Sequence, residues 1–188
     1  MQERSTQEII EILGNDIDRC HSELVTVIDA GEKNSDGTIT ADYGYTARQL
    51  IRATFAYIEA VTFSVKAWSA NHCMENNIEI TPEERYFSID TAFEINSKGE
   101  IYESKAKIPL ASNIRFAIEL KKKAKSDPIP FDASIEWWSC LKKSIKVRDR
   151  LTHPKMPEDV DVSGEDITNV LRARAGFESE ISSIEKQE

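Results

Sequence analysis

Apolar residues recur every three or four positions along most of this chain, which is the pattern of amphipathic helices. The pattern predicts five helices, at residues 3–31, 46–76, 112–126, 131–153 and 163–188. The second has apolar residues around much of its circumference, so it is expected to be the most buried. Its charges Arg52, Glu59 and Lys66 are seven residues apart and form one stripe, which we interpret as solvated or subunit-facing. A buried Arg52–Glu59 arrangement is the alternative.

A different pattern interrupts the helices after Pro82, which is expected to end the helical periodicity. Residues 86–95 alternate loosely, Asn96–Gly99 is typical of a turn, and residues 100–104 resume an extended pattern. These features predict a β-hairpin at about 84–108, which must pack on the helices or on another subunit because a lone hairpin is marginal. The expected fold is an all-α, up-and-down bundle of about five helices with an inserted β-hairpin, in a single domain spanning residues 1–188.

The chain of 188 residues carries a net charge of −9, which is unevenly distributed. The net charge is −7 over residues 1–42, −2 over 43–110, +6 over 111–155 and −6 over 156–188. The acidic total argues against general affinity for nucleic acid, whereas the positive segment could attract a polyanion. The alternative interpretation of the positive segment is a solvated lysine face on two helices, with no polyanion bound.

The number and spacing of the cysteines indicate a reducing compartment. The three cysteines, Cys20, Cys73 and Cys140, are too widely spaced for a zinc site or a disulfide framework. We therefore expect each of them to serve as a small apolar residue of the core. The chain has no run of about eighteen apolar residues that could span a membrane. Its first ten residues are polar and acidic, unlike a signal peptide. We therefore expect a cytoplasmic protein with no metal and no other cofactor.

The positive segment also contains the candidate chemistry, at the end of the helix predicted for residues 131–153. Pro154 disfavours helical geometry at the preceding residue, so the helix should end at His153. Arg148 falls on the half of this helix that should face the bundle, where a cation requires a partner or a function. Arg148, Asp149 and His153 are thus expected together at one helix end.

The stretch RDRLTH at residues 148–153 resembles the signature of the HEPN family, which is an arginine, a polar residue, a few further residues and a histidine. RATFAYIEAVTFSVK, beginning at Arg52, resembles the central helix of that family, and the resemblance covers roughly residues 46–76 and 112–157. It implies an all-α bundle, usually a homodimer in which both motifs line one cleft. Many members are metal-independent endoribonucleases of toxin–antitoxin, abortive-infection or other host-defence systems. Lys155 stands where members modified by a nucleotidyltransferase have tyrosine, so that regulation is not expected.

The resemblance also implies a role for each residue of the site. His153 would act as general acid/base, Arg148 would stabilise the phosphate, and Asp149 could orient either side chain. Attack by a 2′-hydroxyl would leave a 2′,3′-cyclic phosphate and a 5′-hydroxyl. The residues expected to bind RNA are Lys142, Lys146, Arg150 and Lys155, and those expected to support the site from the central helix are Arg52 and Glu59. The expected partners are a second copy of the chain, RNA and an antitoxin protein, with no membrane.

Two other interpretations stay open. The first is a non-catalytic HEPN module that binds a nucleotide or a partner protein, which the overall acidity favours. The second is an unrelated helical interaction domain, in which Arg148 pairs with an acid and His153 caps a helix end. The environment of the two residues separates these interpretations. Exposure in a cleft near a two-fold axis supports the ribonuclease, whereas internal salt-bridging supports the interaction domain.

Overall fold

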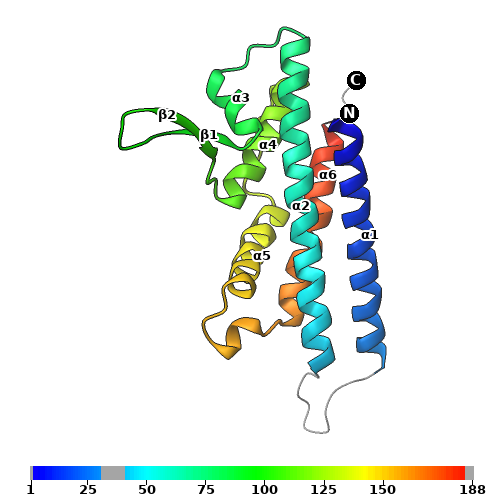
Figure 1. Cartoon of the computed structure of the whole chain (residues 1–188). Helices are drawn as coiled ribbons and strands as arrows, with labels where there is room; N and C mark the ends of the chain where they lie inside the picture. Colours follow the sequence, from blue (N-terminus) through cyan, green and yellow to red (C-terminus); the bar gives the residue numbers. More distant parts are fainter. Residues whose placement is uncertain (1, 31–40, 185–188) are drawn as a thin grey trace. The chain divides into compact units, whose positions relative to one another are not determined.

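The computed structural model describes residues 2–30 and 41–184, and it is all-α with one inserted β-hairpin, as the sequence predicts (Figure 1). The elements are α1 (Gln2–Asp29), α2 (Ala41–Glu75), α3 (Pro82–Ser88), β1 (Thr91–Ile95), β2 (Ile101–Lys105), α4 (Leu110–Ala124), α5 (Glu136–Thr152), the 3-10 helix η1 (Pro157–Val160) and α6 (Gly164–Ser183). Most of residues 32–45, between the first two predicted helices, lie outside the described residues, but α2 begins at Ala41 and not at the predicted residue 46. The last four residues of the helix predicted to reach 188 also lie outside the described residues. Within the described ranges, no helix is long and apolar enough to cross a membrane.

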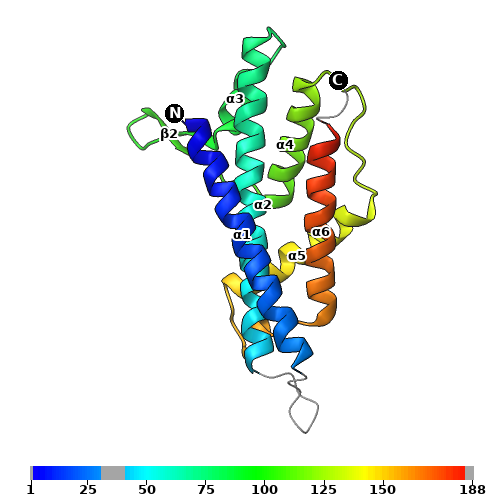
Figure 2. The same ribbon diagram turned by 90° about the vertical axis from the view of Figure 1, so that its right-hand side faces the viewer.

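The chain divides into two compact units, and the divisions fall inside α2 and α6. The first unit comprises residues 1–60 and 133–178, and the second comprises residues 61–132 and 179–188. In the first unit, α1 runs beside the first part of α2 (Figures 1 and 2). The helices of this unit bury a shared apolar core made of Ile17, Leu24, Leu50, Ile51, Phe55, Ile58, Trp138, Leu141, Leu151, Val170 and Phe177.

Specific contacts hold the helices of the first unit together. Arg174 of α6 lies 5.5 Å from the ring centroid of Tyr57 on α2 and 3.7 Å from the carboxylate of Asp18 on α1. Helices α5 and α6 approach each other closely at Gly176, where an added Cβ would lie 2.2 Å from Cβ of Trp137. Any side chain larger than hydrogen at Gly176 would therefore force α5 or Trp137 to move.

The second unit contains a short helix that the sequence analysis did not predict. Pro82 begins α3 instead of ending the helical pattern, and Tyr86–Ser88 is helical, so the strand predicted from residue 86 is wrong there. A capping box explains the difference, because the Thr81 hydroxyl accepts a hydrogen bond from the Glu84 N–H and the Glu84 carboxylate accepts one from the Thr81 N–H. Proline at the first helical position adds to the same preference.

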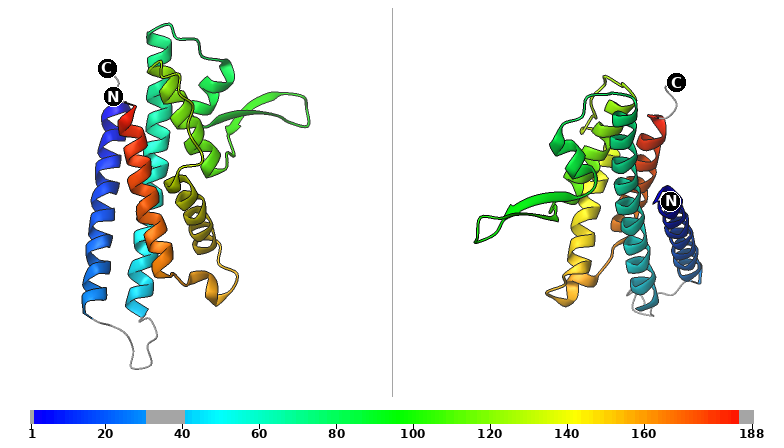
Figure 3. Two further views of the ribbon diagram at one scale, coloured as in Figure 1. Left: turned by 180° about the vertical axis from the view of Figure 1, so that it is seen from behind. Right: turned by 45° about the horizontal axis from the view of Figure 1, so that its top comes forward.

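The predicted hairpin is confirmed over β1 and β2, which pair antiparallel with Ile95 opposite Ile101. The turn lies at Asn96–Gly99, where Gly99 has φ of +79° and its N–H donates to the carbonyl of Asn96 at 3.0 Å. A left-handed φ of this kind favours glycine. Both views in Figure 3 show the hairpin projecting away from α3 and α4.

Lys66 is completely buried, so the interpretation of its stripe as solvated is wrong at this position. Its ammonium donates to three acceptors: Asp90 Oδ1 at 2.5 Å, Asn113 Oδ1 at 2.7 Å and the carbonyl oxygen of Phe87 at 3.1 Å. These acceptors come from the end of α3, from the residue before β1 and from α4. Lys66 therefore joins the base of the hairpin to the helices around it.

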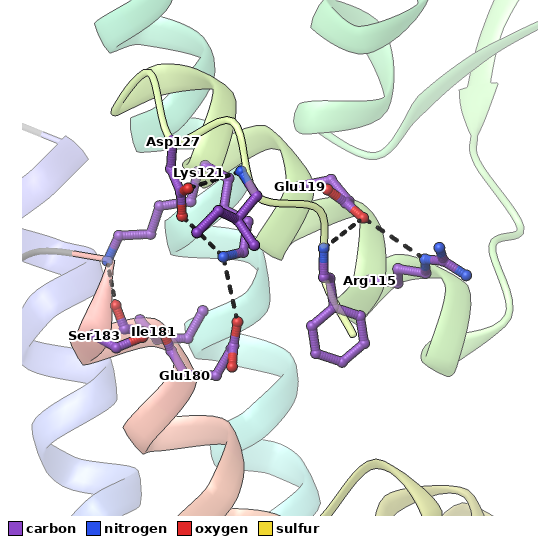
Figure 4. A network of polar contacts seen from close by, with 10 residues as sticks. Arg115, Glu119, Lys121, Asp127, Glu180, Ile181 and Ser183 are labelled. Carbon is purple, nitrogen blue, oxygen red and sulfur yellow. Dashed lines mark hydrogen bonds and ion pairs between the residues drawn. The ribbon is translucent and has the colours of Figure 1, made fainter. Parts of the chain in front are cut away.

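A second lysine network lies at the end of α4, where the unit includes the last residues of α6 (Figure 4). Lys121 donates to the carbonyl oxygen of Ile181 at 3.1 Å. Lys122 lies 2.9 Å from the carboxylate of Asp127 and 3.7 Å from that of Glu180. Lys121 and Lys122 are thus buried and make specific polar contacts, so the interpretation of this run as a solvated lysine face is wrong at these two positions.

We expect Asp127 to make the stability of the fold sensitive to acid. Hydrogen bonds from the Ile129 N–H and from Lys122 lower the pKa of its carboxyl group. A depressed pKa contributes stability above the ordinary aspartate pKa of about 3.9, and this contribution is lost as the pH falls through the folded value. Urea unfolding between pH 6 and pH 2.5 should give a smaller acid-induced loss for Asp127→Asn than for the wild type. The exposed Asp16→Asn is the control, and equal losses in both variants would contradict the expectation.

Candidate active site

Helix α5 presents the predicted motif at its C-terminal end. The helix stops at Thr152, with His153 in a non-helical conformation (φ −129°, ψ 58°), as expected from Pro154. The His153 N–H still donates to the carbonyl of Asp149 at 3.0 Å, which closes the last turn. The start differs from the prediction, because α5 begins at Glu136 and the residues from Phe131 precede it in irregular structure.

Arg148 occupies a half-buried position and contacts two carboxylates. Its Nη2 lies 2.5 Å from Glu59 Oε1 on α2, and its Nη1 lies 3.0 Å from Asp149 Oδ1. The side chain of Arg148 is 32% exposed, so one part of the guanidinium is held by the protein while another part faces solvent. The structure therefore brings together Arg148, Asp149 and Glu59, three of the residues that the sequence analysis selected.

The side chain of His153 is exposed, and it makes no hydrogen bond to any residue in the part of the chain that the structure describes. Asp149 lies one turn earlier on the same side of α5 and also touches Arg148. Arg148 and His153 themselves are five residues apart, which places them about 140° apart around an ideal helix. They share one helix end but not one face.

Lys142 and Lys146 lie on the same face of α5 as His153. The spacings from Lys142 to Lys146, Asp149 and His153 are four, seven and eleven residues, which all return to one side of an α-helix. Both lysines are exposed, and neither has an ion-pair partner among the described residues. This α5 face (Lys142, Lys146, Asp149 and His153) is therefore a line of cationic groups leading to an imidazole, with one carboxylate in it.

Arg150 and Lys155, also expected to bind RNA, have structural contacts. The guanidinium of Arg150 donates to the carbonyl oxygens of Asp159, at 2.7 Å, and of Asp161, and it lies 3.0 Å from the carboxylate of Asp166. The backbone N–H of Lys155 donates to Asp159, while its exposed side chain stays available to a ligand. An RNA phosphate would have to share the donors of Arg150 with these protein acceptors. Arg52 is exposed on α2.

The segment after His153 is held by residues that the sequence analysis did not select. The carboxylate of Asp159 accepts hydrogen bonds from the N–H groups of Lys155, at 2.7 Å, and Met156, at 3.0 Å, and these bonds lower its pKa. Arg48 on α2 donates to the carbonyl of Val160 at 3.2 Å. A proline followed two residues later by an aspartate, as at Pro157 and Asp159, is typical of the start of a helix. This signal in the sequence could have identified Asp159 as the residue that holds the segment after His153.

No group of three or more histidine, cysteine, aspartate or glutamate residues within residues 2–30 and 41–184 is arranged to hold a metal ion. The three cysteines are free thiols, with Cys73 and Cys140 buried and Cys20 partly so. Burial raises the pKa of the Cys20 and Cys73 thiols, which disfavours the reactive thiolate. The chemistry that these residues offer is thus that of arginine, carboxylate and imidazole.

Comparison with protein-family models, with curated proteins and with solved structures gives no match to this chain. The resemblance to the HEPN family therefore rests on the residues quoted for it.

Proposed function

We propose that this protein is a metal-independent endoribonuclease of the HEPN type, acting in a toxin–antitoxin or phage-defence system. The observation that carries the proposal is the α5 face, where two lysines with no ion-pair partner among the described residues lead to the exposed imidazole of His153, with the guanidinium of Arg148 at the same helix end. RNA offers phosphates to the lysines and a reactive 2′-hydroxyl to the imidazole. The positive segment around α5 would attract this substrate despite the net charge of −9.

In the proposed reaction, His153 takes the proton from a 2′-hydroxyl while the 2′-oxygen attacks the adjacent phosphorus. The bond from phosphorus to the 5′-oxygen breaks, and the same imidazole or that of a second copy returns a proton to the leaving oxygen. Arg148 stabilises the negative charge that develops on the phosphate, because its planar guanidinium can form two parallel hydrogen bonds. The products are a 2′,3′-cyclic phosphate and a 5′-hydroxyl.

The placement of Arg148 and His153 on different sides of α5 suggests that two copies complete the site. A separation of about 140° around an ideal helix makes it difficult for both side chains of one copy to reach a single phosphate. A two-fold axis beside α5 would bring Arg148 of one copy towards His153 of the other. The homodimer and its shared site are therefore part of the proposal.

The ion pairs of Arg148 are the internal salt-bridging that the helical interaction domain predicts, so they favour a second, non-catalytic candidate, a helical module that binds a nucleotide or a partner protein. Glu59 and Asp149 already neutralise the guanidinium, and a phosphate must compete with them. In this candidate, Arg148 and Glu59 hold α5 against α2, and the exposed lysines bind the ligand. The measurement that separates the two candidates is turnover.

The test is incubation of the purified protein with a single-stranded RNA in excess EDTA. We expect cleavage to persist and to leave 2′,3′-cyclic phosphate ends, because no step of the reaction uses a metal. A matched RNA with 2′-O-methyl groups should bind and resist cleavage. The double variant Arg148→Ala/His153→Ala, purified in the same way, controls for contaminating nucleases.

Each outcome selects one interpretation. Cleavage by the wild type but not by the double variant supports the ribonuclease. Binding of RNA or of a nucleotide without cleavage supports the module. Neither binding nor cleavage by the wild type would leave the helical interaction domain, and equal cleavage by both proteins would place the activity outside this site.

A further inference from the structure

The hairpin concentrates exposed apolar side chains. The described residues include fifteen large hydrophobic side chains that are exposed, and seven of them lie within residues 86–102: Tyr86, Phe87, Ile89, Phe93, Ile95, Ile101 and Tyr102. Ile95 and Ile101 are each 71% exposed although they lie opposite each other in the sheet. A two-stranded sheet of five-residue strands is marginally stable by itself, so this surface favours a further packing partner.

One face of the hairpin carries most of this apolar surface. Phe93 and Ile95 on β1 and Ile101 on β2 have their side chains on the same side, because side chains alternate along a strand and opposed residues share a face. Tyr86 of α3 extends this surface, with its ring centroid 4.6 Å from that of Phe93 in an edge-to-face contact. Phe93 nevertheless stays 45% exposed.

The outer edge of β1 has unpaired backbone groups. Hydrogen bonds from the Ala106 N–H to the Asp90 carbonyl and from the Asn96 N–H to the Glu100 carbonyl fix the alternation of the ladder. Even-numbered residues of β1 therefore bond to β2, while the N–H and C=O groups of Thr91, Phe93 and Ile95 point away from it. We name these outward groups the β1 edge. The described sheet has two strands only, so no third strand covers the β1 edge.

The β1 edge lacks several of the features that usually prevent pairing between sheet edges. The strand TAFEI contains no lysine, no proline and no glycine. Its single charge, Glu94, accepts a hydrogen bond from the Tyr102 hydroxyl at 2.9 Å and lies on the opposite face from Phe93. The outer edge of β2 differs, because Glu103 and Lys105 lie on it.

The sequence of β1 is complementary to itself under two-fold symmetry. If two copies pair antiparallel with Phe93 opposite Phe93, then Thr91 lies opposite Ile95 and Ala92 lies opposite Glu94. All three pairs formed by residues 91, 93 and 95 then use outward-facing backbone groups, and no like charges oppose each other. The equivalent full overlap of β2 would place Glu103 opposite Glu103, which is unfavourable. This charge pattern selects β1 and a second copy of the chain.

We infer that the hairpin is a self-association site, in which the β1 edges of two copies pair antiparallel about Phe93 to form a continuous four-stranded sheet. This inference rests on the hairpin alone and does not depend on the proposed ribonuclease activity. The contact joins short strands, so we expect association at tens of micromolar and not at nanomolar concentration. The base of the hairpin, fixed by the hydrogen bonds of Lys66 to Asp90 and Asn113, would hold the β1 edge in place.

The test uses opposite charges at the proposed symmetry axis. Phe93→Glu and Phe93→Lys should each weaken self-association at least tenfold in sedimentation equilibrium, because like charges would face each other. An equimolar mixture of the two variants should regain the assembly, since glutamate would then oppose lysine. Ile12→Glu, a substitution of an exposed residue on α1, is the control and should behave as the wild type. Circular dichroism verifies that each variant keeps its helices.

The alternatives give different results. A wild type that stays monomeric at 100 µM would overturn the inference. A wild-type assembly that neither variant weakens would place self-association elsewhere, for example near α5, and would leave the ribonuclease proposal unaffected. Weakening by both variants without recovery in the mixture would reject the antiparallel pairing about Phe93 and indicate a different apolar contact between the copies.

Discussion

Replacing Lys66 with methionine should lower the free energy of unfolding by about 2–4 kcal/mol, although the two side chains have similar volumes. The ammonium of Lys66 is fully buried and donates to Asp90, Asn113 and the carbonyl oxygen of Phe87. Methionine cannot donate, so three acceptors lose their partner at once. The side chain of Asp90 is 25% exposed, and water can therefore solvate part of the carboxylate that is left, which places the estimate below that for a fully buried pair.

Urea unfolding followed by circular dichroism measures this loss, with Lys142→Met on α5 as the exposed control. The control should change the free energy of unfolding by less than about 0.5 kcal/mol. The double variant Lys66→Met/Asp90→Asn should recover part of the loss, because it removes the uncompensated charge as well. If Lys66→Met unfolds at the same urea concentration as the wild type, the lysine network does not stabilise the base of the hairpin.

Periodicity predicts the long helices because each buries one apolar stripe, and a stripe is a local property of the sequence. The turn at Asn96–Gly99 is predicted equally well, since glycine readily adopts the left-handed conformation observed at Gly99. The helix α3 is not predicted, because it lacks the periodic pattern that reveals the long helices. Its seven residues are too few for a periodic signal, and the capping box of Thr81 and Glu84 decides their conformation.

Burial of individual polar residues is much harder to predict from sequence. Arg52, Glu59 and Lys66 have the same spacing on α2, yet Arg52 is exposed and Lys66 is completely buried. The difference arises because α3, Asp90 before β1, and α4 meet the side chain of Lys66, and the sequence does not show which elements will lie over a given turn of α2. Gly176 gives a similar case. A residue without a side chain is needed there because Trp137 approaches from another helix, and the sequence does not show that approach.

The candidate site is predictable in part. The end of α5 at His153 follows from Pro154, and the need of Arg148 for a partner follows from its position on the helix. The identity of that partner depends on how α2 and α5 pack. The sequence analysis selects Glu59 only because its helix resembles the central helix of the HEPN family. The position of η1 and α6 beside α5 directs Arg150 to the carbonyl groups of Asp159 and Asp161 and to the carboxylate of Asp166, and so changes its availability for RNA.

His153→Ala should reduce the rate of RNA cleavage by about 10²–10⁴-fold, if the proposed function is correct, because proton transfer by a positioned group contributes this much. Imidazole is the side chain that changes its charge near neutral pH, so it can both accept and donate the proton. His153 is exposed at a helix end, and its removal should leave the thermal unfolding temperature within about 2 °C of the wild type. His21→Ala, which removes an exposed histidine on α1, is the matched control and should retain full activity.

Arg148 should show a different combination of effects, since it has both a proposed catalytic role and a structural contact. Arg148→Ala should reduce cleavage by about 10²–10³-fold, the usual loss for one donor to a developing oxyanion. It should also lower stability modestly, because Glu59 loses a partner at 2.5 Å in a half-exposed pair. Glu59→Gln tests the coupling: it keeps the shape and frees the guanidinium, so stability should fall slightly while cleavage persists. Full cleavage by purified His153→Ala or Arg148→Ala would remove that residue from the mechanism, whereas loss of cleavage in proportion to loss of folded protein would assign Arg148 a purely structural role.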